Sequence, residues 1–393
     1  MDITKVRIVS IQETLLALSL FLYPFIYVNH TLYIIPQALF TLMAIWGTSI
    51  KLNISKILMI FFGIIAFIIP MFIEYSVVST NQDLFVKLVV NSITIFAIAI
   101  SPNFSLSENI LKKIKICVYA WLIIIFIAYS KTGLSGISVV ISGLMYGDSL
   151  SSSSLYEAAT PLKDIFITKN ISSMFMVAVF SFYVYLSVNF EKKVSNFISI
   201  LFFILALAFV SRQGLLGFLA ILFLYKYRYF GKVGKLFTIA SAFFVISFVF
   251  KKLFDLSNSA DGASERVMLW RYFFAHYNEF LFTGMGLDAL NANLITKIGI
   301  DNFHMFFMNQ IGAYGVFHFI TFSLFLILIY INGNGKFKLI LVLAYFMNIL
   351  FQAYGYEFGN LFLFMTMLIH LKYKVDPEFS NKPVRYRFKF KAS

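Results

Sequence analysis

Apolar stretches of about 15–20 residues follow one another along most of the chain, with short polar segments between them. Stretches of this length are typical of helices that cross a membrane, because about 20 helical residues span the hydrocarbon core. The pattern therefore predicts an all-α, polytopic integral membrane protein with about 12 transmembrane helices, in a single domain over residues 1–393. The predicted spans cover 11–28, 31–47, 57–75, 85–101, 114–130, 170–188, 197–210, 214–230, 236–252, 303–331, 339–355 and 358–371.

Two long polar segments interrupt this pattern, at 131–169 and at 253–302. The first contains four consecutive serines but no arginine. In the second, Ser264 is suited to cap the start of a helix, and Gly284 and Gly286 are suited to end it. The second segment is therefore expected to carry a helix outside the membrane spans.

The predicted helix of the second segment has an aromatic stripe. At about 100° per residue, one face is shared by Arg266, Trp270, Phe273 and Tyr277. An aromatic face with an arginine at one end is typical of a helix lying in the membrane interface. Arg271 lies about 140° from Arg266, so the two arginines are not expected to bind the same group.

Composition and charge agree with a membrane protein and add an orientation. The chain is 60% hydrophobic and only 13% charged, whereas soluble domains carry about a quarter charged residues. With the N-terminus in the cytoplasm, most Lys and Arg fall in cytoplasmic segments, including the basic tail 372–393, and both long polar segments fall outside. The net charge of +14 therefore reports orientation in the membrane and does not indicate nucleic-acid binding.

Residues 197–225 admit two interpretations, one long span or two spans that turn at Ser-Arg-Gln-Gly, 211–214. The basic segments on either side, at 192–193 and 226–235, both favour the cytoplasm, which requires an even number of crossings between them. A lone arginine at mid-bilayer also costs several kcal/mol. We therefore predict two spans with Arg212 at the outer end, where its guanidinium and nearby helix N-termini are suited to bind phosphate oxygens. The alternative is an arginine that only reaches toward the lipid headgroups.

His304 follows Asp301 closely at the start of a span. A histidine oriented by a carboxylate can take a proton from a sugar hydroxyl as a general base. The alternative role is a hydrogen-bonding cap at the start of the helix. His276, His318 and His370 are expected to serve packing or interface anchoring. No Cys/His cluster or Asp-x-Asp motif with metal-ligand spacing is present, so neither a metal nor another cofactor is expected.

Three groups of motifs follow one another between residues 197 and 330. They are Ser-Arg-Gln-Gly at 211–214, then E-R-V-M-L-W-R and F-L-F-T-G-M-G in the second polar segment, and finally His304 with N-Q-I-G-A-Y-G-V at 309–316. In order and spacing, the chain resembles the O-antigen polymerase and O-antigen ligase superfamily of membrane glycosyltransferases. It departs from that pattern at Met305, where the family often has Asn, and in lacking an arginine motif in the first polar segment.

The resemblance implies that Arg212 and Arg266, with Arg271 as a further arginine of the same helix, bind the diphosphate of a lipid-linked donor. It also implies that His304 activates the acceptor. We therefore predict a metal-independent glycosyltransferase that polymerises undecaprenyl-diphosphate-linked oligosaccharide repeats of O-antigen or capsule polysaccharide. The predicted location is the bacterial inner membrane, with the active site facing the periplasm. The expected partners are the lipid-linked oligosaccharide, membrane lipid and a chain-length regulator protein, and nucleic acid is not among them.

Two alternatives stay open from the sequence. A ligase of the same superfamily would transfer the finished chain to lipid A–core. A polysaccharide flippase or other transporter is a different class, in which two similar halves and charges at mid-membrane are common. Neither feature is evident in this sequence, which disfavours the transporter.

Overall fold

The structure, a computed structural model, describes residues 3–25, 32–45, 52–73, 89–90, 92–94, 96–99, 105–132, 138, 159–236, 240, 262–353 and 359–371. In these residues the chain is almost entirely helical, which confirms the predicted helical class. The extended elements among them are a parallel pair of two-residue strands, β1 (Ser105–Leu106) and β2 (His370–Leu371), and an isolated antiparallel bridge between Phe25 and Phe166.

Most of the helices coincide with predicted spans. They are α1 (Ile3–Leu22), α2 (Ile34–Ile45), α3 (Ile54–Ile73), α6 (Asn109–Thr132), α9 (Thr160–Lys163), α10 (Lys169–Asn189), α11 (Asn196–Ala208), α12 (Arg212–Tyr227), α14 (Gly262–Phe280), α15 (Leu287–Ile298), α16 (Phe306–Asn332), α17 (Leu339–Phe351), α18 (Gly359–Met365) and the 3-10 turn η2 (Thr366–Leu368). In the described part of the chain, α3, α10 and α16 are long and apolar enough to cross a membrane, and several shorter helices are similarly apolar. The predicted spans 85–101 and 236–252 lie largely outside the described residues, as does the tail 372–393.

The last predicted span, 358–371, is not one continuous helix. It consists of the seven-residue helix α18, the η2 turn and strand β2. The strand forms because Leu371 pairs with Leu106, next to the start of α6. The chain therefore reaches its tail through an extended segment instead of a full-length helix.

Helix α10 forms the centre of the bundle. Every residue from Ile171 to Asn189 is buried, as expected for a helix that is apolar on all sides. It packs against α6, α11, α12, α17 and α18. Phe180 of α10 stacks on Phe218 of α12 at 4.8 Å between ring centroids and contacts Phe202 of α11 at 5.0 Å. Aromatic packing around α10 thus holds the α11–α12 pair in place.

Basic residues from distant segments gather at one end of the bundle. Lys192 forms an ion pair with Glu108 at 3.2 Å, and the Lys336 backbone N–H donates to Asn189 Oδ1 at 2.5 Å. We call this the basic end, and it holds Lys113, Lys192, Lys226, Lys336 and Lys338. The starts of α10, α12 and α16 lie at the opposite end, which we call the site end.

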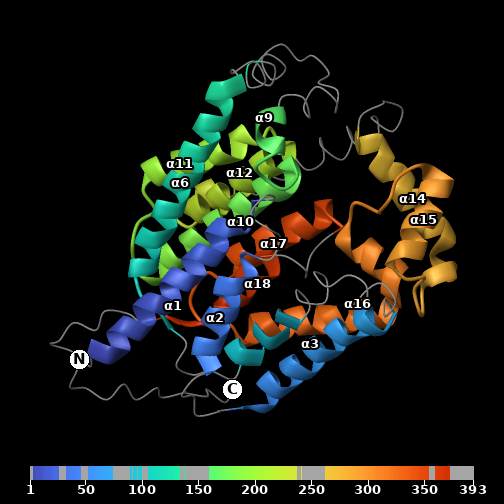
Figure 1. The fold of residues 1–393 in the computed structure, drawn as a ribbon, viewed down its shortest axis with the longest axis horizontal. Helices are drawn as coiled ribbons and strands as arrows, with labels where there is room; N and C mark the ends of the chain where they lie inside the picture. The colour runs from blue at the N-terminus through green and yellow to red at the C-terminus, as the bar shows by residue number, and fades with distance from the viewer. Residues whose placement is uncertain are drawn as a thin grey trace.

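A second, smaller core lies beside the bundle and is built from α14, α15 and the start of α16 (Figure 1). Its buried side chains are Leu269, Phe273, Phe280, Leu290, Leu294, Phe303, Met308, Ala313 and Tyr314. Most of the predicted 253–302 segment is therefore two packed helices. Helix α15 was not predicted, and α14 begins at Gly262, upstream of the predicted cap at Ser264.

The buried face of α14 is rotated from the predicted one. Leu269, Phe273 and Phe280 face the second core, whereas Trp270 and Tyr277 are exposed. The prediction placed the largest aromatic residues of this helix on one face. In the structure, α15 packs instead against the face that contains Leu269. Trp270 and Tyr277 remain on the outer face of α14, where an interfacial helix would present them to lipid.

Candidate functional site

The chain turns between two helices just before the Ser-Arg-Gln-Gly segment, as predicted, with Ser211 as the cap and residues 212–214 in the first turn of the second helix. Helix α11 ends at Ala208 and α12 begins at Arg212, so the single-span alternative is wrong. The two helices form an antiparallel hairpin, because Lys226 Nζ at the end of α12 donates to Asn196 Oδ1 at the start of α11, at 3.3 Å. Arg212 is therefore the first residue of α12 at the site end, and its side chain lies outside what the structure describes.

Ser211 caps α12 and ties it to α10. Its Oγ accepts a hydrogen bond from the Gly214 backbone N–H at 3.3 Å and donates to Asn170 Oδ1 at 2.8 Å. Asn170 is the second residue of α10, so the N-termini of α10 and α12 are neighbours. Two adjacent helix N-termini present backbone N–H groups and positive dipole ends, an arrangement that favours an anion.

Gly214 has a packing role that the sequence did not indicate. A Cβ atom on Gly214 would lie 1.6 Å from Ser173 Oγ of α10. The space above this glycine is therefore filled by α10. Its neighbour Gln213 accepts a hydrogen bond from Gln352 Nε2, at the end of α17, at 3.0 Å.

Asn170 and Gln352 were missed by sequence interpretation. They lie 41 and 139 positions from the residues that they contact, Ser211 and Gln213, and neither belongs to a local motif. The structure adds both to the polar cluster around the start of α12.

Arg266 and Arg271 both lie on α14, as predicted, and they face different surroundings. Arg266 is half-buried, whereas Arg271 is exposed. Five helical positions separate them, which corresponds to about 140° around the axis. Of the two, Arg266 is the less exposed.

The loop between α14 and α15 docks onto a kink in α16. Gly315 has a φ of 81° and a ψ of 171°, which interrupts α16 and exposes backbone groups to the loop. The backbone N–H of Gly286 donates to Ala313 O at 2.9 Å, and that of Val316 donates to Leu281 O at 2.6 Å. Gly284 and Gly286 follow the end of α14 at Phe280, as predicted, and their docking onto α16 is an addition that was not predicted.

Glycines at this crossing allow two backbones to touch. A Cβ on Gly284 would lie 2.2 Å from Ala313 O, and one on Gly315 would lie 2.2 Å from Phe282 O. Phe273 of α14 also packs edge-on against Phe303 at 5.3 Å between ring centroids. As a result, the helix that carries Arg266 and the start of α16 belong to one packed unit.

His304 lies in a tight turn just before α16. Its φ is 49°, in the left-handed region. Its backbone N–H donates to Asn302 Oδ1 at 2.8 Å, and Asn302 Nδ2 in turn donates to Asp301 Oδ1 at 2.6 Å. Asp301 is thus linked to the His304 backbone through Asn302, and the role of its carboxylate as orienting partner of the imidazole stays a prediction. The Asn302 side chain holds the turn, a role that was not predicted.

A tyrosine and two further histidines pack near the site elements. His276 stacks on Tyr272 of the same helix at 4.1 Å, and Tyr272 donates to Asn293 Oδ1 of α15 at 3.4 Å. Partial burial and the Glu279 carboxylate raise the pKa of Tyr272, so it stays a neutral donor at pH 7. His318 is buried in α16, with Nε2 3.0 Å from Ala66 O of α3. Both histidines therefore contribute to packing, as predicted.

No family model, no curated protein and no solved structure matches the chain. The functional argument therefore depends on the chain's own geometry. Across the described residues, no group of three or more His, Cys, Asp or Glu side chains is placed to hold a metal ion.

The structure brings two of the predicted site segments to the same end of the molecule. Helix α12 runs from Arg212 toward the basic end, and α16 runs from His304 toward that same end, where Asn332 donates to Ser55 Oγ of α3. Arg212 and His304 therefore both start helices at the site end. The packed α14–α15 unit places Arg266 on the element that docks beside His304.

Proposed function

We propose that this protein is a metal-independent membrane glycosyltransferase that polymerises undecaprenyl-diphosphate-linked oligosaccharide repeats. The observation that carries the proposal is the position of Arg212 and His304 at the starts of two helices at the same end of the bundle, opposite the basic end. A cationic anchor and a base are the two groups that such a transfer needs from the protein.

The proposed orientation follows from the distribution of charge. Cytoplasmic segments of membrane proteins are enriched in Lys and Arg, so the basic end faces the cytoplasm. The site end then faces the periplasm of a bacterial inner membrane, and the full chain makes about 12 crossings. Exposed Trp270 and Tyr277 on α14 fit a helix that rests in the outer interface.

In the proposed reaction, the growing glycan on undecaprenyl diphosphate is the donor and the next lipid-linked repeat is the acceptor. His304 takes the proton from an acceptor sugar hydroxyl as its oxygen bonds to the anomeric carbon of the donor. The bond between that carbon and the diphosphate oxygen breaks, and undecaprenyl diphosphate leaves with the electron pair. The Arg212 guanidinium and the N-termini of α10 and α12 stabilise the charge that develops on the diphosphate.

Arg266 has a different place in the proposed site. It is half-buried on the α14 unit, which is docked to α16 next to His304. We therefore place Arg266 on the side of the acceptor or of the second phosphate, with Arg212 on the donor diphosphate. Arg271 is exposed and is available to lipid headgroups or to the diphosphate as it enters.

Deletion of the gene in its host tests this proposal through the banding of lipopolysaccharide on a gel. Loss of a polymerase leaves core carrying a single repeat. Bare core would instead identify a ligase, and the absence of any exported repeat would identify a flippase. Either of those two outcomes overturns the proposed reaction, and complementation by the wild-type chain is the control.

A further inference from the structure

Helices α1 and α6 lie side by side and point in the same direction. Lys113 Nζ near the start of α6 donates to Thr14 Oγ1 at 2.9 Å, and two turns further along Trp121 Nε1 donates to Phe21 O at 3.1 Å. The paired residues are 99 and 100 positions apart in the chain, so the two helices are parallel and stay in register. Their shared surface is away from α14, α15 and the α16 kink (Figure 1).

A groove of about 280 Å³ runs between these two helices. Its apolar walls are formed by Ala17, Leu18, Phe21, Ile116, Cys117 and Ala120. From Lys113 to Ala120 it extends over seven helical residues, which is about 10 Å. Small side chains at Ala17, Cys117 and Ala120 leave the space open. The groove volume lies below the range of about 300–1,000 Å³ that is typical of small-molecule pockets. The apolar lining along the two helices suits a hydrocarbon chain.

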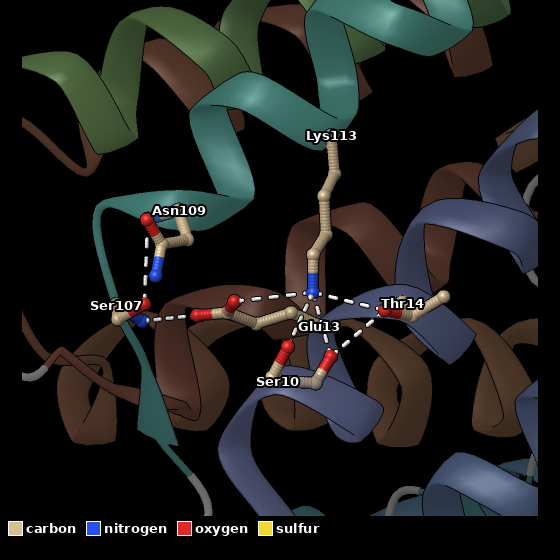
Figure 2. Close-up of polar contacts among 6 residues, drawn as sticks. All are labelled: Ser10, Glu13, Thr14, Ser107, Asn109 and Lys113. Carbon is tan, nitrogen blue, oxygen red and sulfur yellow. Dashed lines mark hydrogen bonds and ion pairs between the residues drawn. The ribbon is translucent and has the colours of Figure 1, made fainter. Parts of the chain in front are cut away.

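The groove ends in a polar, cationic mouth at the basic end. Figure 2 shows Lys113 reaching from α6 to α1, where its Nζ donates to Ser10 O at 2.6 Å and lies 3.4 Å from Glu13 Oε2. Glu13 is fully buried, and its Oε1 accepts from the Ser107 backbone N–H at 2.6 Å.

More positive charge surrounds this mouth than Glu13 neutralises. Lys112 and Lys115 flank Lys113 on the first turns of α6, and Lys112 is exposed. Lys115 lies about 160° around α6 from Lys113, away from the groove, whereas Lys112 is adjacent to Lys113 at the mouth. Lys112 and Lys113 together outnumber the one buried carboxylate of Glu13, so the mouth keeps a positive charge. The apolar rim beside it is open, with Leu18 43% exposed and Ile116 65% exposed.

We propose that this groove binds one acyl chain of an anionic phospholipid, with the lipid phosphate held at the lysine turn of α6. Apolar walls accept the chain, and the positive mouth lies where the headgroup of a cytoplasmic-leaflet lipid is found. The lipid diphosphate of the proposed reaction is at the opposite end of the bundle. The groove is therefore a site of its own, and it rests on the proposed membrane orientation but not on the proposed reaction.

Native mass spectrometry of the purified full chain, titrated with phosphatidylglycerol, tests the proposal. Ala120→Leu fills the groove, and Ala220→Leu adds the same side chain to a half-buried position of α12 outside the groove. We expect one phosphatidylglycerol per chain, bound about tenfold more weakly by Ala120→Leu and unchanged in Ala220→Leu. Phosphatidylcholine is expected to bind about tenfold more weakly than phosphatidylglycerol, because it carries no net charge to meet the lysines. Equal affinities of the two variants, or of the two lipids, overturn the proposal.

Cys117 provides a second test that needs no substitution, because it is the chain's sole cysteine and lines the groove. We expect phosphatidylglycerol to slow alkylation of Cys117 by N-ethylmaleimide at least tenfold in delipidated protein, and phosphatidylcholine at the same concentration to have little effect. This measurement decides the question if Ala120→Leu fails to fold, as judged by its thermal transition. An alkylation rate that is the same with and without phosphatidylglycerol refutes occupation of the groove.

Discussion

Replacing Gly284 with alanine tests whether the docking of the α14–α15 unit onto α16 controls activity. Gly284 has a φ of 71°, and its Cβ would lie 2.2 Å from Ala313 O. The contact is with backbone, so no side-chain rotation relieves it. Alanine must therefore push the loop away from α16. The matched control is Gly299→Ala at the end of α15, where φ is 82° but a Cβ meets nothing within 4 Å.

Both substitutions strain the backbone, but only Gly284→Ala also breaks hydrogen bonds between the loop and α16. A left-handed conformation costs an L-residue about 1–2 kcal/mol, and both variants carry that strain. In Gly284→Ala the loop also loses the hydrogen bonds from Met285 N to Gly312 O and from Gly286 N to Ala313 O, which are 3.0 and 2.9 Å long. Each is worth about 0.5–1.5 kcal/mol. Docking is therefore weakened by about 2–5 kcal/mol in Gly284→Ala and is unaffected by the distant Gly299→Ala.

Hydrogen–deuterium exchange at the Met285 and Gly286 amides measures docking directly. We expect exchange on the order of 30-fold faster or more in Gly284→Ala, since each 1.4 kcal/mol of local opening is a factor of ten. Polymer formation from purified lipid-linked repeats should fall in parallel, while exchange within α10 stays slow. If Gly284→Ala and Gly299→Ala exchange equally at these amides, the docking argument is wrong. If docking is lost and polymer forms normally, Arg266 has no part in the site.

Three further predictions concern the site and its orientation. Arg212→Lys is expected to lower kcat/KM for polymer formation about 100-fold, nearly as far as Arg212→Ala, because a diphosphate contact needs the planar fork; normal activity in Arg212→Lys would show that charge alone suffices. His304→Ala and His304→Gln are both expected to lower the rate about 10²–10⁴-fold in folded protein, and Asp301→Asn to lower it less. Near-normal activity in His304→Gln would reduce the imidazole to a cap. In a chain without its native cysteine, Lys163→Cys is expected to react with an impermeant maleimide from the periplasm and Lys193→Cys is not; the reverse pattern would place the site on the cytoplasmic side.

Helix positions could be predicted from the sequence because apolar runs and breaks are local signals. The hairpin at Ser211 followed from charge alone, since the basic segments on either side had to lie at one end. Helix α15 was missed although its signal is present, with Leu287, Leu290, Leu294 and Ile298 spaced as one helical face. Only one helix was predicted in this polar segment, from the aromatic stripe that begins at Arg266, and the weaker apolar face of α15 follows it.

Contacts between segments could not be predicted from the sequence. Gln352 contacts Gln213 across 139 positions, and the crossing of Gly284 over Gly315 depends on two backbones meeting at a kink. Neither contact has a local pattern, because each residue alone is compatible with an ordinary turn or helix end. The turn at His304 is partly local, since Asn302 lies only two positions before it. An asparagine side chain that accepts from a backbone N–H two residues further on is a common turn former, so this turn has a local signal.

Helix α16, which is kinked at Gly315, packs in both hydrophobic cores and so connects the Arg266 part of the proposed site to the Arg212 part. Before the kink, Met308 and Tyr314 pack in the second core with α14 and α15, and Phe306 packs on Phe322 beyond the kink at 5.3 Å between ring centroids. After the kink, Phe322 and Phe325 pack in the core of the main bundle, which also holds α12. Rotation at Gly315 would therefore change the separation of the two site segments and would also break the contact between Phe306 and Phe322. The backbone hydrogen bonds from the α14–α15 loop cross this kink and oppose that rotation. Docking of the loop thus does two things at once, since it holds Arg266 on the site side and fixes the angle at which the His304 turn meets the bundle.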